Sequence, residues 1–163
     1  MEIEIRPAVT ADAAGVAHVY NDGIEERKAT FETRPREEGE IAAEIEGRGE
    51  APFLVAVRDG EIAGWARLTA YSDRQCYSGV GEASLYVART ARGRGVGRRL
   101  FEALAAEAAE AGYWKVIGLL FPENEASVAL VRACGCRVVG THLRHGRLDG
   151  EWRDVVIVER LLD

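Results

Sequence analysis

The chain has 163 residues, of which 47% are hydrophobic and 29% charged, and its net charge at pH 7 is -6. These values are typical of one folded domain spanning residues 1–163, and they argue against disorder and against a non-specific nucleic-acid binder, which carries a basic surplus. No apolar run reaches the roughly eighteen residues of a membrane-spanning helix.

Three cysteines, Cys76, Cys134 and Cys136, stand at positions that fit no disulfide or zinc motif. An odd number of cysteines without framework spacing indicates reduced thiols, so we expect a cytoplasmic protein. Cys134 and Cys136 are interpreted as small buried apolar side chains. The acidic, alternating residues 1–6 indicate a strand and lack the basic and apolar regions of a secretion signal.

The first half of the chain alternates between helical and strand periodicity. Thr10 is the expected N-cap of a helix that runs through Asn21, and a second, charged helix follows it. Asp59-Gly60 is a hairpin turn signal, so the strands on either side of it are expected to pair antiparallel. The expected elements are a strand over 2–6, helices over 10–21 and 37–48, and strands over 53–57, 61–69 and 82–88.

The second half begins with a long amphipathic helix that Gly112 ends. Residues 114–121 suit a central strand, Asn124 caps a short helix, and a hairpin turning at Asp149-Gly150 joins strands over 136–144 and 152–161. The order β-α-α-β-β-β-α-β-α-β-β predicts an α/β fold built on a mixed sheet. The apolar stripe of the long helix is expected at Val96, Leu100, Leu104, Ala108 and Ala111.

The segment Arg92 to Gly97, which reads Arg-Gly-Arg-Gly-Val-Gly, joins an expected strand to the long helix. Such a junction presents unpaired N–H groups and the positive end of a helix dipole, and its glycines let an anion approach the backbone. Arg92 and Arg94 add charge that suits phosphate. The spacing is not that of a dinucleotide-binding fingerprint, and Gly-Lys-Ser/Thr is missing, so a different phosphate ligand is expected.

The Arg-x-x-Gly-x-Gly spacing of Arg92, Gly95 and Gly97 resembles the coenzyme A pyrophosphate loop of the GNAT N-acetyltransferases. Asn124 and Ser127 are similar to a downstream Asn-x-x-Ser segment of that family. The resemblance implies an acetyl-CoA-dependent enzyme with a centrally splayed sheet, in which one strand pairs its backbone with pantetheine. The residues it implies for acetyl-CoA are Leu85, Tyr86, Val87, Arg92, Gly93, Arg94, Gly95, Val96, Gly97, Arg98, Asn124 and Ser127.

A closer resemblance runs nearly end to end. Residues 20–21, 29–35, 81–87, 145–146 and 152–154 are similar to segments of the phosphinothricin and methionine sulfoximine N-acetyltransferases, and residues 144–154 look most like their arsinothricin branch. The resemblance implies a small glutamate-like amino acid as substrate, a detoxification role and a homodimer. The residues it implies for the substrate are Phe31, Ser72, Asp73, Arg74, Glu82, Ala83, Ser84 and His145.

Acetyl transfer to an α-amine requires a base, because an α-ammonium is mostly protonated at neutral pH. Glu82 matches the acidic residue of the family's strand and is the expected base. Arg74 matches an arginine of the phosphinothricin enzymes and is expected to hold the acidic group of the substrate. The residues alone leave open that Glu82 is a strand-end carboxylate and Arg74 a solvated loop side chain.

The remaining polar residues leave several questions open. His142 and His145 are expected to face different sides of a strand, so no metal site is expected, and His145 fits either the substrate pocket or a dimer contact. No tyrosine stands on the helix after Asn124, which leaves the general acid unassigned. No motif places a histidine beside Cys76, so direct transfer without an acyl-enzyme is expected.

Two other functions remain open beside the amino-acid acetyltransferase. One is a catalytically silent acetyl-CoA-binding module, and the other is an enzyme that acetylates a peptide or protein amine. For assembly, the apolar run 155–158 predicts that the hairpin over 138–160 lies near the interface of a two-fold dimer.

Overall fold

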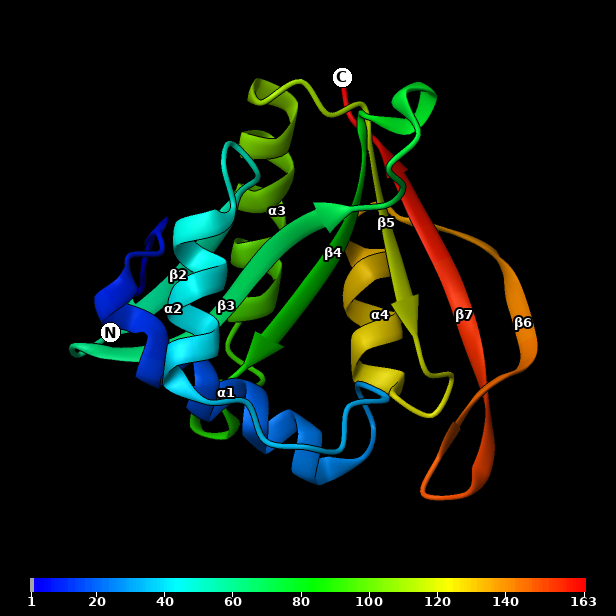
Figure 1. Ribbon diagram of the computed structural model, residues 1–163, viewed down its shortest axis with the longest axis horizontal. Coiled ribbons are helices and arrows are strands. Elements are labelled where there is room, and N and C mark those ends of the chain that lie inside the picture. The colour runs from blue at the N-terminus through cyan, green and yellow to red at the C-terminus, as the bar shows by residue number, and fades with distance from the viewer. Residues whose placement is uncertain (1) are drawn as a thin grey trace.

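The computed structural model describes residues 2–163, and it has one seven-stranded mixed sheet with helices on both faces (Figure 1). The element order confirms the α/β architecture expected from the sequence. The strands are β1 (Glu4–Pro7), β2 (Phe53–Arg58), β3 (Glu61–Ala70), β4 (Val80–Val87), β5 (Lys115–Leu120), β6 (Arg137–Leu148) and β7 (Glu151–Leu161). The helices are α1 (Ala13–Glu26), α2 (Glu38–Gly47), α3 (Val96–Glu110) and α4 (Glu125–Ala133).

The strands follow the spatial order β1-β2-β3-β4-β5-β7-β6. Every neighbouring pair is antiparallel except β4 and β5, which are parallel. The two parallel strands pair only over Val80–Glu82 and Lys115–Ile117. Beyond these residues β4 stays with β3 and β5 stays with β7, so the sheet opens in its middle, as Figure 1 shows.

Each face of the sheet is covered by a different pair of helices. On one face α3 buries Leu100, Leu104 and Ala108 against β2, β3 and β4, and α4 packs beside it. On the other face α1 and α2 bury apolar side chains around Phe53 and Trp65. Because alternate residues of a strand point to opposite faces, β4 contributes Leu85 and Val87 to the first core and Tyr86 to the second. Among residues 2–163 no helix is long and apolar enough to cross a bilayer.

The first helix begins and ends differently from the prediction. A 3-10 turn over Thr10–Asp12, with Val9 at its N-cap, precedes α1, and the carboxylate of Asp12 reaches back to accept from the Val9 amide at 2.9 Å. Thr10 is therefore not the N-cap, because it lies inside the 3-10 turn and α1 begins after Asp12, whose carboxylate is also held by Arg6 at 2.8 Å. The helix continues past Asn21 to Glu26 and ends at Arg27 in the left-handed conformation.

The apolar stripe of α3 is confirmed from Val96 to Ala108, but Ala111 is an exposed C-cap residue outside it. The apolar run 155–158, from which a nearby dimer interface is expected, is covered within the chain itself. That run lies in β7, between β5 and β6, where Val155, Val156 and Val158 are buried. The edge strand is β6, which is exposed along nearly its whole length.

Candidate active site

The opening between β4 and β5 leaves main-chain groups of β4 without a strand partner. The Tyr71 amide donates to Val80 O and the Ala88 amide donates to Ala63 O, so even-numbered residues of β4 exchange hydrogen bonds with β3. Alternation then directs the N–H and C=O groups of Ala83 and Leu85 into the opening. The main-chain N–H and C=O groups of Tyr86 point toward β3 and are used in that pairing. The expectation that they bind the pantetheine of the cofactor is therefore wrong.

The glycine loop after β4 leads directly into the first turn of α3. Gly93 and Gly95 have φ of +74° and +81°, and a side chain is strained in that region. Gly97 has a different reason to be glycine, since a Cβ there would lie 2.9 Å from Leu130. Among residues 2–163, the first amide of α3 with a main-chain acceptor is that of Arg99, which donates to Gly95 O. The amides of the first turn are therefore available to an anion.

The arginines around this loop differ in whether their charge is free. Arg94 and Arg98 are exposed and form no ion pair within the described residues, so both can meet a phosphate. Arg92 instead donates to both oxygens of Glu26, at 2.6 and 2.8 Å, and to Val87 O at 3.2 Å. The expectation that Arg92 offers free charge to phosphate is therefore wrong, because a carboxylate at the end of α1 already neutralises it.

A cavity of about 510 Å³ occupies the opening and extends to the loop between α1 and α2. Its volume suits a small-molecule site, and it brings residues from distant parts of the chain together. The predicted site residues that line it are Phe31, Glu82, Ala83, Ser84, Leu85, Tyr86, Asn124, Ser127 and His145. Of the other predicted residues, Val87 ends β4 beside the opening, Val96 and Gly97 are buried in the first turn of α3, and Ser72, Asp73 and Arg74 lie outside the lining.

Glu82 lies at the point where the two central strands separate. It is the last residue of β4 paired with β5, opposite Ile117, and its partner on β3 is Thr69. Its side chain is half-buried at the cavity wall, and no ion pair is formed by it among the residues that the structure describes. A carboxylate in this position can accept a proton from a group that enters the opening.

Asn124 is confirmed as the N-cap of α4, since its side-chain oxygen accepts from the Ser127 amide at 3.3 Å. Both residues line the cavity. The side-chain nitrogen Nδ2 of Asn124 and the hydroxyl of Ser127 have no partner in the described part of the chain, so these polar groups can serve a ligand while the cap is kept.

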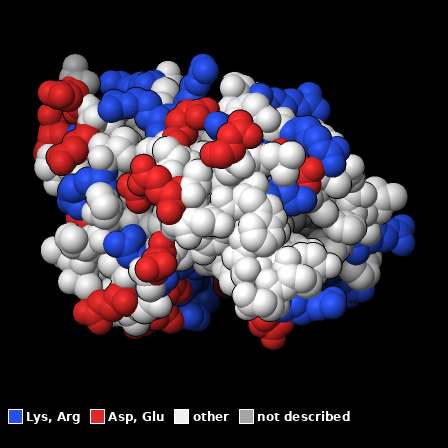
Figure 2. Space-filling model, turned by 90° about the horizontal axis from the view of Figure 1, so that it is seen from above, with Lys and Arg blue, Asp and Glu red and all other residues white. Residues whose placement is uncertain are grey.

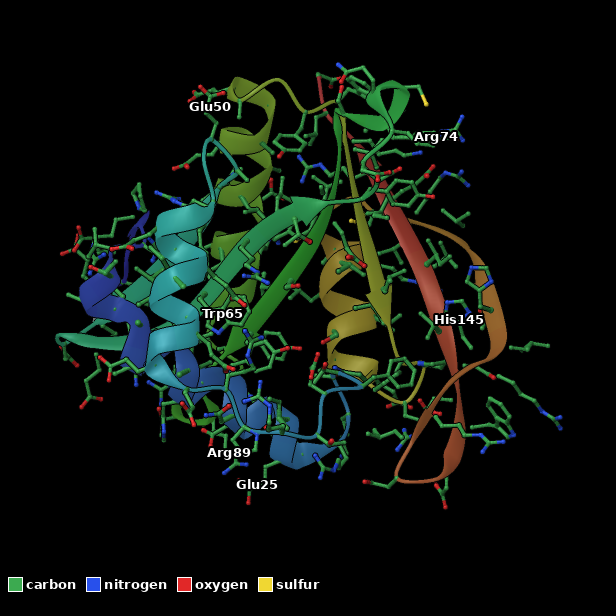
Figure 3. The ribbon with its side chains drawn as sticks, viewed as in Figure 1. Glu25, Glu50, Trp65, Arg74, Arg89 and His145 are labelled. Carbon is green, nitrogen blue, oxygen red and sulfur yellow. The ribbon has the colours of Figure 1, made fainter. Side chains whose placement is uncertain are left out.

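The expectation that Ser72, Asp73 and Arg74 line the substrate pocket is wrong for a single chain. The turn that follows β3 holds the Arg74 guanidinium over the ring of Tyr77, 5.6 Å from its centroid. This end of the molecule is viewed in Figure 2, where uncharged atoms cover the centre and acidic and basic side chains are mixed around them. In Figure 3 Arg74 lies at the end opposite Arg89 and Glu25.

The two histidines of β6 share one face of the strand, contrary to the prediction. Their rings stack with centroids 4.3 Å apart and planes 12° from parallel. The pairing of β6 with β7 shifts register between His142 and Gly146, and Arg144 within the shift has φ +48° and donates its amide to Asp154. This bulge resets the alternation, so both imidazoles come to the same side. His145 projects from β6 in Figure 3 and lines the cavity.

The wall opposite Glu82 includes residues that the sequence did not single out. Phe31 meets Phe121 edge to face, with ring centroids 4.8 Å apart. In the sequence Phe121 is only the end of an apolar run, and nothing there places it beside a loop about ninety residues earlier. Tyr20 also lines the cavity, where it lies in an aromatic stack with Trp65 and Tyr86. Burial raises the pKa of the Tyr86 phenol, so its hydroxyl stays protonated.

The cysteines and acidic residues form no second reactive centre. Cys134 and Cys136 are buried as expected, and burial raises the pKa of the Cys136 thiol to about 11. A thiol in that state is a poor nucleophile at neutral pH. Cys76 is exposed on the turn after β3. Within residues 2–163 no group of three or more His, Cys, Asp or Glu side chains could hold a metal ion.

Known proteins share this sequence pattern and architecture. The Acetyltransferase (GNAT) family profile matches residues 17–136. A phosphinothricin N-acetyltransferase of Streptomyces coelicolor is 35% identical over 99% of this chain and 97% of its own length. An L-methionine sulfoximine/L-methionine sulfone acetyltransferase of Pseudomonas paraeruginosa is 28% identical over 100% of this chain and 96% of its own length.

A solved structure shows the same arrangement. A GNAT superfamily phosphinothricin acetyltransferase from Sinorhizobium meliloti, in complex with acetyl-CoA, superposes with a TM-score of 0.91 at 31% identity. The match covers 99% of this chain and 89% of that one.

Proposed function

The chain belongs to the GNAT acetyltransferase family, and from this premise we propose that it acetylates the α-amine of a small glutamate-like amino acid. It is an acetyl-CoA-dependent N-acetyltransferase of the phosphinothricin and methionine sulfoximine type. The leading substrates are phosphinothricin, methionine sulfoximine and arsinothricin. The observation that carries the proposal is the cavity in the opening between β4 and β5, with Glu82 where the strands separate and Phe31 and His145 on the amino-acid side.

The proposed reaction is direct transfer with both substrates bound. Glu82 accepts a proton from the substrate ammonium, directly or through water, and the neutral amine attacks the thioester carbonyl. The new N–C bond forms as the C–S bond breaks, and the proton that the nitrogen then loses passes to the leaving thiolate of coenzyme A, which departs as the thiol. The amides of Ala83 and Leu85 hold the pantetheine arm along β4, and the first turn of α3, with Arg94 and Arg98, holds the pyrophosphate.

The acidic group of the substrate needs a cation that the cavity lining does not supply. Among the described lining residues Glu32 and Glu82 are acidic, and none is lysine or arginine. We propose a homodimer in which a second copy brings Arg74 to the pocket. The exposed edge strand β6, with Leu143 76% exposed, and the exposed rings of Tyr71 and Tyr77 beside Arg74 support such an assembly.

The biological setting is proposed on the same basis. The chain acts as one catalytic domain over residues 1–163 and removes the toxicity of a glutamate analogue by acetylating it. A cytoplasmic location is proposed because all three cysteines are free thiols.

One assay tests this function against its rivals. Release of the coenzyme A thiol is measured with acetyl-CoA and either a panel of acidic amino acids or a basic peptide. We expect turnover with a glutamate-like amino acid, a raised amino-acid KM but an unchanged acetyl-CoA KM in Arg74→Ala, and a dimer in sedimentation at micromolar concentration. Turnover with the peptide alone would favour a protein acetyltransferase, and acetyl-CoA binding without any turnover would favour a silent binding module.

A further inference from the structure

We propose that Gly146 is a specificity-determining residue. By having no side chain it leaves room for the ring of Phe31, and the position of that ring limits the length of the amino-acid substrate. This inference rests on the proposed function, since it concerns the amino-acid end of the same cavity. Phe31 lies in the loop between α1 and α2, Gly146 lies in β6, and both line the cavity.

Space, and not backbone conformation, explains the glycine at position 146. Gly146 has no positive φ, in contrast to Gly93, Gly95 and Gly150, so any residue could adopt its backbone. A Cβ atom built there would lie 2.7 Å from both Cε1 and Cζ of Phe31. Real Cβ contacts essentially never fall so short, so the ring of Phe31 lies where a side chain of residue 146 would be.

The ring of Phe31 is supported on a second side by Phe121. Their planes stand at 86°, an edge-to-face contact, and Phe121 is itself buried with Leu148 and Val155. The guanidinium of Arg153 also packs over the ring of Phe121, 5.4 Å from its centroid. With β6 and Phe121 fixed, a ring pushed away from residue 146 moves into the cavity or its mouth.

The loop that carries Phe31 cannot recede as a whole, because both of its ends are tied down. At its start Arg27 pairs with Asp149 of the β6–β7 turn at 3.0 Å. At its end the side chain of Asn21 holds the main chain of Arg36, accepting from its amide at 2.7 Å and donating to its carbonyl at 3.0 Å. The position of the Phe31 ring therefore depends on local contacts, chiefly the one with Gly146.

The consequence is a wall whose depth is set by the pair Phe31 and Gly146. A methyl group at position 146 displaces the ring and shortens the space for the substrate side chain. A smaller residue at position 31 lengthens that space. Acidic amino acids that differ by one methylene report such a change directly, because a pocket discriminates one methylene by about 10- to 200-fold.

The test compares Gly146→Ala, Phe31→Leu and the double variant by steady-state kinetics on L-aspartate, L-glutamate, L-2-aminoadipate and phosphinothricin. In Gly146→Ala we expect the KM of the best substrate to rise about tenfold or more, with kcat and the acetyl-CoA KM close to wild type. Phe31→Leu should shift the substrate preference toward the longest acid. In the double variant the amino-acid KM, raised by Gly146→Ala, should fall back toward the wild-type value. Gly47→Ala in α2 is the matched control, since nothing lies within 4 Å of its Cβ, its φ is not positive, and it lies outside both the cavity lining and β6.

The outcomes distinguish a failure of the inference about Gly146 from a failure of the proposed acetyltransferase function. If the wild type acetylates none of these acids and neither methionine sulfoximine nor arsinothricin, the proposed function fails, and a crystal structure of Gly146→Ala still decides the inference. A displaced Phe31 ring supports it, and an unmoved ring overturns it. If the wild type is active, an unchanged amino-acid KM in Gly146→Ala overturns the inference. A folded double variant whose amino-acid KM stays as high as that of Gly146→Ala also overturns it.

Discussion

The carboxylate of Glu26 holds the guanidinium of Arg92 through two hydrogen bonds, 2.6 and 2.8 Å long, across 66 residues of sequence. This pair joins the end of α1 to the first residue of the glycine loop. Arg89, on the turn after β4, extends the pair into a network with Asp22, Glu25 and Glu26, and Figure 3 shows Arg89 beside Glu25 at this end of the molecule. An anionic side chain thus stands beside the proposed pyrophosphate site and competes with phosphate for Arg92.

Glu26→Gln should tighten acetyl-CoA binding. The variant leaves the full charge of Arg92 beside the loop, where it attracts a pyrophosphate, and the gain should shrink as salt screens it. Calorimetry at low and high ionic strength measures both effects. Glu25→Gln is the control, because that exposed carboxylate contacts Arg89 only, at 3.4 Å. Weaker binding in Glu26→Gln would mean that the pair serves as a structural brace for the loop.

Acid stability should depend on Asp12. The hydrogen bond from Arg6 lowers the pKa of Asp12, and the Val9 amide lowers it further, against an opposing effect of burial. A carboxyl whose folded pKa lies below its unfolded value stabilises the protein above the unfolded value, and this stabilisation is lost as pH falls through the folded pKa. Asp12→Ala should therefore cost about 1.5–3 kcal/mol at pH 7, the usual value of a hydrogen bond to a charged group, because it removes the acceptor of Arg6 and of the Val9 amide.

Urea denaturation of the wild type and Asp12→Ala at pH 7 and in acid tests this prediction. The gap between their free energies of unfolding should narrow as the pH falls below the ordinary pKa of an aspartate. A gap that stays constant with pH would show that the charge of Asp12 contributes nothing and that only its packing matters.

The sequence predicted those features that depend on near neighbours. The glycine loop, the Asn124 cap and the hairpin turn at Asp149-Gly150 are each fixed by residues a few positions apart, and all three are present. The partner of Arg92 could not be predicted, because Glu26 reaches it only when α1 packs beside the end of β4. The stacking of His142 on His145 was missed because the bulge in β6 depends on Asp154 of the facing strand.

Gly95→Ala should weaken acetyl-CoA binding strongly. Gly95 has φ +81° at the N-cap of α3, so a side chain there costs about 1–2 kcal/mol of strain or shifts the loop amides out of position. The expected result is a rise of about tenfold in the Kd for acetyl-CoA, measured by calorimetry. Gly39→Ala in α2 is the control, because nothing lies within 4 Å of its Cβ and its φ is not positive. Unchanged affinity in Gly95→Ala would place the pyrophosphate elsewhere.

Glu82→Gln should lower turnover by about 10²–10⁴-fold, the usual contribution of a general base. Glutamine keeps the size of the side chain but cannot accept the proton, so acetyl-CoA affinity should stay close to wild type. In the wild type kcat/KM should rise with pH and then flatten once the amine is neutral. Glu32→Gln removes the other carboxylate that lines the cavity and should leave the pH profile in place. An equal loss in both variants would argue for a general electrostatic effect instead of proton transfer.

Cys76→Ser should remain fully active, because the chemistry requires no acyl-enzyme. An acyl-enzyme needs an activated nucleophile. Cys134 and Cys136 are buried thiols with raised pKa values, and Cys76 is exposed on a turn outside the cavity lining. Double-reciprocal plots with varied acetyl-CoA and amino acid should therefore intersect, as they do when both substrates bind before either product leaves. Parallel lines, or labelled acetyl groups trapped on Cys76, would move the chemistry from Glu82 to that thiol.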